Sequence, residues 1–272
     1  MSNIQNCAKA ISSTGFGTIQ MTSAMMESYA SLVEGFQHIS EETKKSYCFV
    51  GDTDGFLPFG SEYSNVKNNP DLCERFCYWH AHNERRKSHA FSRESYLQAA
   101  MNYEREISKL ATKLLDEICR EFDAPTFPDI RDNSYLQLCV YPAAEIDNGR
   151  QFAQDPHEDG HLLSFIRPSL DGLVIVRGRS LEPVRLLQNE LAVLSGSLLT
   201  QLSDCAIPAT YHAVLSPQPP RRRSSLIYFA NPNVTDKFIG FWRKKHVDLS
   251  KTLNDHHTGF GNQPIPLQPM MT

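Results

Sequence analysis

The chain has 272 residues, of which 40% are hydrophobic and 21% charged, and this balance is ordinary for a folded globular protein. Its formal net charge is −4 and its one dense basic run is Arg221–Arg223, which argues against nucleic-acid binding. No apolar run reaches the roughly 18 residues of a membrane-spanning helix. Met1–Ala10 lacks a signal-peptide core and the seven cysteines lack a disulfide-framework spacing, so a reducing, cytoplasmic location is expected.

The first half of the chain has the apolar spacing of helices. Residues 22–38 carry an apolar stripe at a spacing of three to four residues, which predicts a helix. The strongest helix is expected at about residues 92–122, with an apolar face that we expect to pack against a sheet. Between these helices, residues 52–60 are rich in Gly, Asp and Pro and are expected to form a loop. Cys73 and Cys77 are interpreted as neighbours on a helix face rather than as a zinc site.

The second half changes to short β-rich runs separated by Gly, Pro, Asn and Asp. The predicted strands are residues 135–141, 162–166, 172–176, 191–194, 211–215 and 225–229. A helical half followed by a strand half is not the alternation of a doubly wound sheet. Many short strands at this spacing instead predict a sandwich or a barrel.

The segment Asp155–His161 satisfies two metal motifs at once. Read as H-E-x-x-H on a helix, it offers His157 and His161 as zinc ligands and Glu158 as the base of a metalloprotease. Read as H-x-D in an extended or turn segment, it offers His157 and Asp159 as two ligands of a facial iron triad. The helical reading is disfavoured because Asp159 and the glycine after it are poor helix formers.

The iron reading requires a third ligand, a neutral histidine on a distant strand. His212 lies in the predicted strand 211–215 and is the candidate. Downstream, Arg223 and Ser225 would point to the same face of a strand because side chains alternate. Both could hold the far carboxylate of a co-substrate such as 2-oxoglutarate, for which the planar fork of arginine is well suited.

In this order, His157-x-Asp159, His212 and Arg223-x-Ser225 resemble the motifs of the Fe(II)/2-oxoglutarate-dependent dioxygenases, in particular the isopenicillin N synthase-like family. The resemblance to this family extends over most of the chain, with some departures from its motifs. Leu138–Pro142 resembles the family's L-N-x-Y-P strand, with Cys139 where Asn is usual, and Ser225–Pro232 resembles its S-I-x-x-F-x-N-P ending. At Gly196–Leu199, Gly-Ser-Leu-Leu replaces the usual Gly-Asp, and the customary I-P-x-I-D-L opening is absent.

The resemblance implies an α+β, mainly β fold: a double-stranded β-helix, or jelly roll, with N-terminal helices packed on it. We expect one oxygenase domain over residues 1–272. Its expected parts are a mainly helical N-terminal part at 1–130, a jelly-roll core with the metal site at 131–232, and a C-terminal helix and tail at 233–272. The tail, with Phe238, Phe241 and Trp242, is expected near the pocket mouth or in plain core packing.

The resemblance also implies the site residues and the reaction. The implied catalytic residues and Fe(II) ligands are His157, Asp159 and His212. The implied 2-oxoglutarate contacts are Arg223, Ser225 and Tyr141. The expected reaction uses O2 and 2-oxoglutarate to hydroxylate, or else to desaturate or cyclise, a small molecule such as an amino-acid derivative or specialised metabolite, releasing succinate and CO2.

Three other functions stay open at this point. One is an iron oxidase of the same fold that does not use 2-oxoglutarate. Another is the H-E-x-x-H zinc metalloprotease, and the third is a catalytically inactive binding protein on this scaffold. The substrate identity and the oligomeric state are also open.

Overall fold

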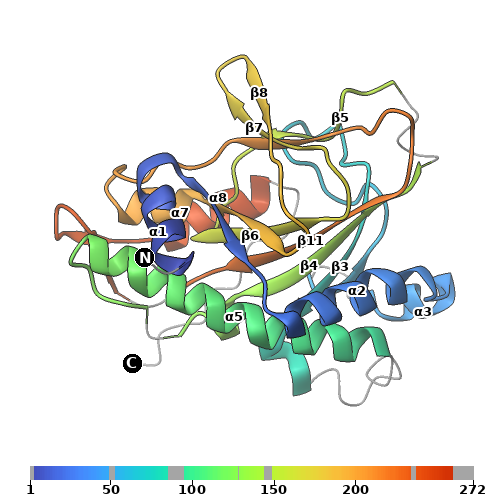
Figure 1. Cartoon of the computed structure of the whole chain (residues 1–272), viewed down its shortest axis with the longest axis horizontal. Helices are drawn as coiled ribbons and strands as arrows, with labels where there is room; N and C mark the ends of the chain where they lie inside the picture. The colour runs from blue at the N-terminus through green and yellow to red at the C-terminus, as the bar shows by residue number, and fades with distance from the viewer. Residues whose placement is uncertain are drawn as a thin grey trace.

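The computed structural model describes residues 3–48, 53–84, 95–127, 129–143, 149–233 and 237–259. Two antiparallel β-sheets lie face to face, and the long helices cover the outer face of the larger sheet (Figure 1). The larger sheet has the strand order β1-β9-β6-β11-β4-β3-β2, and the smaller has the order β5-β10-β7-β8. This arrangement is the predicted jelly roll with helices packed on it.

The helices and strands have the following bounds. The described α-helices are α1 (Asn3–Thr14), α2 (Ser23–Gln37), α3 (Glu41–Ser46), α5 (Ser95–Glu121), α7 (Ser197–Leu202) and α8 (Ser250–Gly259). The strands of the larger sheet are β1 (Phe16–Gln20), β2 (Gly55–Leu57), β3 (Glu74–Trp79), β4 (Tyr135–Tyr141), β6 (Leu163–Pro168), β9 (Glu190–Ser195) and β11 (Arg223–Ala230). Those of the smaller sheet are β5 (Phe152–His157), β7 (Leu173–Arg177), β8 (Ser180–Pro183) and β10 (His212–Leu215). A small hairpin of β12 (Phe238–Ile239) and β13 (His246–Val247) precedes α8.

Strand β4 shows how the larger sheet separates two cores. Leu136, Leu138 and Val140 belong to the hydrophobic cluster shared with the helices. Cys139 and Tyr141, which alternate with them, belong to a second cluster shared with the smaller sheet. Successive side chains of a strand point to opposite faces, so one face supports the helices and the other is turned to the space between the sheets.

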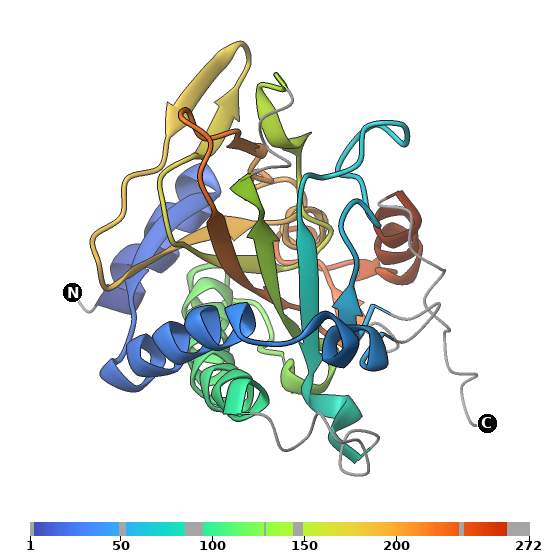
Figure 2. The same cartoon turned by 90° about the vertical axis from the view of Figure 1, so that its right-hand side faces the viewer.

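Helix α5 crosses the outer face of the larger sheet and packs against α1 and α2 (Figure 2). Its apolar stripe, from Leu97 to Ile118, is buried, which confirms the predicted packing against a sheet. Helix α2 begins where predicted, because the Thr22 side chain accepts a hydrogen bond from the Met25 backbone N–H. The predicted helix start at residue 92 lies outside the described residues.

A buried ion pair holds α5 against the segment that enters β4. Glu104 in α5 is fully buried, and its carboxylate accepts hydrogen bonds from Arg131 Nη2 at 2.7 Å and Nε at 3.0 Å. Removing one partner of such a pair leaves a buried charge without compensation, which is strongly destabilising. The pair therefore fixes the position of α5 on the sheet.

The first half contains strands that the sequence pattern did not predict. Cys73 and Cys77 are not neighbours on a helix: Cys77 lies in β3 and Cys73 directly precedes it. The expected loop at 52–60 contains β2, which pairs with β3. Strand β3 was missed because it carries the charged Arg75 towards the space between the sheets, which conceals the alternation expected of a half-buried strand.

Each of the six strands predicted in the second half overlaps a strand of the structure. The bounds of β4 agree at both ends, and those of the others differ by one or two residues. Strands β5 and β8 were not predicted. Among the helices of the described residues, none combines the length and apolar character that a bilayer crossing requires.

Candidate metal centre

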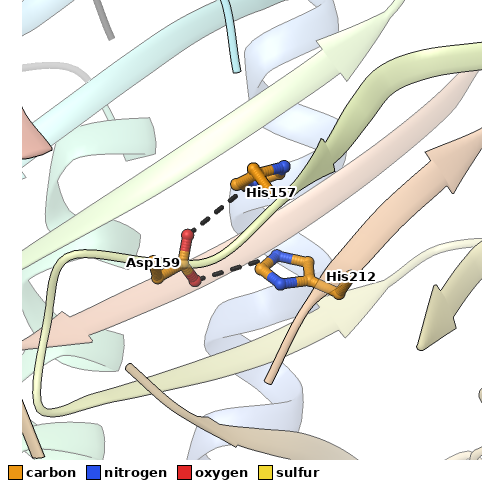
Figure 3. A group of neighbouring side chains, drawn as sticks. All are labelled: His157, Asp159 and His212. Atoms are coloured by element: carbon orange, nitrogen blue, oxygen red, sulfur yellow. Dashed lines mark ion pairs between the residues drawn. The ribbon is translucent and has the colours of Figure 1, made fainter. Parts of the chain in front are cut away.

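The two histidines predicted as metal ligands lie opposite each other at one end of the smaller sheet. His157 is the last residue of β5, His212 is the first residue of β10, and the antiparallel ladder pairs them directly. Their ring centroids are 4.4 Å apart. Asp159 follows β5 in an irregular segment that turns its carboxylate towards both rings (Figure 3).

These three side chains form a cluster whose candidate donor atoms all lie within 4.8 Å of one another. His157 Nε2 lies 3.6 Å from Asp159 Oδ1, and His212 Nε2 lies 3.8 Å from Asp159 Oδ2. Three donors about 2.1 Å from one metal, at right angles, would lie about 3 Å apart. A small inward movement of buried side chains is therefore enough to hold a divalent ion.

Backbone carbonyls orient both imidazoles. His157 Nδ1 lies 2.7 Å from the carbonyl oxygen of Asp155, and His212 Nδ1 lies 3.1 Å from that of Thr210. A carbonyl oxygen can only accept, so each Nδ1 carries the proton and each Nε2 keeps its lone pair. This is the tautomer in which metal-ligating histidines are commonly held.

Charge also favours metal binding. Burial lowers the pKa of His212 to about 4, although Asp159 opposes the shift, so the ring is neutral at pH 7. Burial by itself would raise the pKa of Asp159, but the nearby histidines and the hydrogen bond from Ser164 outweigh it and hold that pKa below its usual value. The Ser164 hydroxyl donates to Asp159 Oδ2 at 2.5 Å. The site thus offers two imidazole nitrogens and one carboxylate, a ligand set typical of non-haem Fe(II).

The segment that carries Asp159 is held against the start of α7. The Asp159 carbonyl accepts hydrogen bonds from the Ser197 backbone N–H at 2.9 Å and the Ser197 hydroxyl at 3.0 Å. A Cβ on Gly196 would lie 2.2 Å from the carbonyl oxygen of His161 and 2.6 Å from that of Asp159. Only glycine permits this close approach, and the Gly-Ser of this chain serves to anchor the ligand segment.

The residues predicted to contact a co-substrate lie together on adjacent strands. Arg223 in β11 pairs with Tyr141 in β4, and its guanidinium lies over the Tyr141 ring at 5.1 Å. Arg223 Nη1 donates to Ser225 Oγ at 2.8 Å, while Nε and Nη2 have no hydrogen-bond partner in the described part of the chain. Arg223 is 1% exposed. Buried N–H groups are almost always paired, so this guanidinium fits an acceptor that the described residues do not supply.

A pocket of about 570 Å³, counted to its open mouth, reaches the metal cluster. His157 and Asp159 line it, and the described lining includes neither His212 nor Arg223. Its polar lining consists of Glu62, Ser64, Asp71, Arg75, Gln137 and Gln154. Its aromatic lining consists of Tyr63, Tyr135, His161 and Phe229. Apart from His161 and the aromatic ending of β11, none of these polar and aromatic lining residues belongs to a motif that the sequence analysis recognised.

The helical H-E-x-x-H reading is wrong, because His157 ends a strand and the following residues are irregular. His161 is not part of the metal cluster formed by the described residues. Its Nδ1 lies 2.9 Å from Asn231 Oδ1, and its ring lies 4.2 Å from that of Phe229. His161 therefore belongs to the wall of the pocket.

The C-terminal residues were expected either near the pocket mouth or in core packing, and both roles occur. Phe238 and Phe241 are buried, with rings 6.1 Å from Phe127 and 5.7 Å from Phe122. They serve core packing, whereas Trp242 is 72% exposed. Leu253 of α8 lines the pocket. The pocket contact thus comes from further along the chain than the three aromatic residues predicted for it.

No protein-family model and no curated protein sequence matches the chain. Solved structures do match over nearly its whole length. A full-length Neurospora crassa protein, crystallised in complex with alpha-KG (2-oxoglutarate) and 5-formyluracil, has a TM-score of 0.73 and 17% identity over 95% of this chain and 90% of that chain. The rice dioxygenase for auxin oxidation has a TM-score of 0.74 and 13% identity over 96% of this chain and 91% of that chain.

JOX2, in complex with 2OG, Fe and JA, has a TM-score of 0.66 and 18% identity over 86% of this chain and 72% of that chain. These similarities confirm the double-stranded β-helix. At such identities they establish the fold alone, and function has to be argued from the site.

Proposed function

We propose that the protein is an Fe(II)- and 2-oxoglutarate-dependent dioxygenase that oxidises a small molecule, of the isopenicillin N synthase-like type. Its Fe(II) ligands are His157, Asp159 and His212. The proposal rests on the presence in one fold of this buried cluster and of the buried Arg223, whose Nε and Nη2 have no hydrogen-bond partner among the described residues. Structural neighbours that were crystallised with alpha-KG, or with 2OG and Fe, support the same conclusion.

The residues have separate tasks in this proposal. Two imidazoles and one carboxylate would hold the metal, a set of three protein ligands that suits an Fe(II) ion with open positions. Arg223 and Ser225 bind the far carboxylate of 2-oxoglutarate, and Tyr141 closes the site beside them. Bound Fe(II), with 2-oxoglutarate as the reductant, activates O2, and succinate and CO2 are the co-products. The surrounding apolar residues exclude water from the reaction.

Hydroxylation is the expected outcome of the reaction, with desaturation or ring closure as variants of the same oxidation. The nearest competing function is an iron oxidase that does not use 2-oxoglutarate. Arg223 disfavours this oxidase, because without 2-oxoglutarate the two unpaired nitrogens of the buried guanidinium would have no acceptor to bind.

The test measures succinate formed from 2-oxoglutarate by the Fe(II)-loaded protein in air, across a panel of small molecules. The expected result is succinate formation that one compound accelerates, with loss of turnover in Asp159→Ala and its retention in Glu158→Gln. Oxygen consumption with a compound but without succinate would identify the oxidase instead. Complete absence of 2-oxoglutarate turnover would reject the dioxygenase.

A further inference from the structure

A second fully buried arginine, Arg75, lines the pocket beside the metal cluster. It lies in β3 opposite Cys139 of β4, on the side of the sheet that faces the site. Arg75 Nε lies 3.0 Å from Glu62 Oε2, and Nη2 donates to Asp71. Its Nη1 has no hydrogen-bond partner among the described residues. Like Arg223, this side chain therefore has a buried donor for which the described residues supply no acceptor.

The position of Arg75 is fixed by groups that need no ligand. Asp71 also accepts hydrogen bonds from the Ser64 hydroxyl at 2.9 Å and from Gln154 Nε2 at 3.1 Å. Gln154 in turn accepts a hydrogen bond from the Tyr141 hydroxyl at 2.5 Å. The guanidinium is thus held rigidly before any ligand arrives, and such preorganisation lowers the entropic cost of binding.

Gln137, next to Arg75, is a second polar group whose hydrogen-bond partners in the described residues are weak. It projects from β4 into the pocket and is 7% exposed. Its Oε1 accepts from Cys77 Sγ at 3.4 Å, and its Nε2 donates to Cys139 Sγ at 3.3 Å. Sulfur is a weak hydrogen-bond partner, so both ends of this amide keep capacity for a better one. An amide with a free donor and acceptor is complementary to another amide.

Three rings, those of Tyr135, His161 and Phe229, also line the pocket, and Tyr135 lies two residues before Gln137 on the same face of β4. Their centroids lie 4.2 to 5.7 Å apart, with Phe229 next to both others. Aromatic walls of this kind favour flat ligands, which stack on them with large contact area.

The charge of the polar wall restricts the ligand further. Two carboxylates of the lining, Glu62 and Asp71, face the cation of Arg75. A negatively charged substrate would meet this surplus of like charge, whereas a neutral hydrogen-bonding group would not.

We infer that the pocket binds a neutral, planar substrate with an amide-type edge, its carbonyl oxygen accepting from Arg75 Nη1 and its N–H and C=O pairing with Gln137. This inference rests on the proposed function, because it names the substrate class of that same site. It makes Arg75 a substrate-binding residue rather than only a partner for Glu62 and Asp71.

Titration calorimetry with three probes tests the inference on the wild-type protein, metal-free and again with Fe(II) and 2-oxoglutarate under argon. The probes are uracil, a small planar cyclic amide; 1,3-dimethyluracil, which keeps the carbonyls but lacks the N–H groups; and benzoate, a planar anion. Uracil is expected to bind at least 10-fold more tightly than either of the others, a difference of about 1.4 kcal/mol. Equal or tighter binding of benzoate, or no uracil binding at about 10 mM, would overturn the inference.

Three variants separate binding from folding. Arg75→Lys keeps the charge but loses the fork, and it should weaken uracil binding by about 10- to 100-fold, as expected for a lost charged hydrogen bond. Arg131→Lys makes the same replacement in an ion pair outside the pocket and should leave uracil binding unchanged. Gln137→Met serves if Arg75→Lys does not fold, with at least a several-fold loss expected. Unchanged binding in the folded variant would contradict the proposed contact.

Failure of this inference is distinguishable from failure of the proposed function. Uracil binding to the metal-free protein does not depend on iron chemistry, so its selectivity would support the substrate class even if no succinate were formed. Succinate formation without preference for amide-type compounds would overturn the substrate class and leave the dioxygenase in place.

Discussion

The replacement Arg223→Met has two consequences of different kinds, one on stability and one on co-substrate binding. The two unpaired nitrogens of this buried guanidinium cost about 2–6 kcal/mol, at roughly 1–3 kcal/mol for each unsatisfied donor. Methionine removes that cost. It also removes the charged hydrogen bond to Ser225 and the contact with the Tyr141 ring, worth together about 2–5 kcal/mol. The terms nearly cancel, so the free energy of unfolding of the ligand-free protein should change by no more than about 2 kcal/mol.

Co-substrate binding, in contrast, should be lost. A buried carboxylate deprived of its guanidinium loses about 3–5 kcal/mol, which raises the Kd for 2-oxoglutarate by roughly 10²- to 10⁴-fold. Urea unfolding measures the stability without ligand, and calorimetry measures the Kd. At about 100 times its Kd, 2-oxoglutarate should stabilise the wild-type protein by about 2.7 kcal/mol and the variant hardly at all.

Arg131→Met is the matched control, because this arginine has a partner within the chain. Its removal leaves the fully buried Glu104 carboxylate unpaired and should cost roughly 2–4 kcal/mol, since Arg131 is itself partly exposed. Its 2-oxoglutarate affinity should stay that of the wild type. The reasoning is refuted if Arg223→Met loses as much stability as Arg131→Met while binding 2-oxoglutarate normally.

Three further predictions concern the metal cluster. In Gly196→Ala the new Cβ would lie 2.2 Å from a backbone carbonyl oxygen, so the free energy of unfolding in urea should fall by about 1–3 kcal/mol. In the control Gly35→Ala, where the nearest neighbour lies at 3.6 Å, the free energy of unfolding should rise by up to about 1 kcal/mol. Equal effects of the two replacements would contradict the close approach at Gly196. Ser164→Ala removes the hydrogen bond to the Asp159 carboxylate and should weaken Fe(II) binding about 10- to 100-fold in a chelator competition. The control Ser108→Ala removes a hydrogen bond within α5 and should leave Fe(II) binding unchanged. Because burial lowers the pKa of His212 to about 4, the metal-free protein should lose up to about 3 kcal/mol as pH falls from 6.5 to 4, and a variant without this histidine should not show that slope.

The metal and co-substrate motifs could be recognised in the sequence because all their residues except His212 lie in two short segments. His157 and Asp159 are two residues apart, as are Arg223 and Ser225. The Gly, Pro, Asn and Asp residues that flank these segments are typical of the turns that bound short strands. Strand β4 was predicted with its bounds because its apolar residues dominate. The structure then brings His212 opposite His157, as the triad requires.

The walls of the pocket could not be predicted, since they depend on the register between strands. Arg75 and Gln137 lie on neighbouring strands and face the site only because β3 pairs with β4 as it does. A shift of β3 by one residue would turn Arg75 to the helix side and away from Gln137. Ser164 and Ser197 reach the carboxylate ligand or its backbone from separate elements, with no local sequence signal for either contact.

Anaerobic reconstitution with Fe(II) and 2-oxoglutarate tests the central claim most directly. A metal held by His157, Asp159 and His212 beside Arg223 should give a weak visible charge-transfer band in the wild-type protein when both components are present. The band should be absent in His212→Ala and should require far more 2-oxoglutarate in Arg223→Met. A band of wild-type strength in His212→Ala, or no band in a wild-type protein that binds both components, would contradict the account.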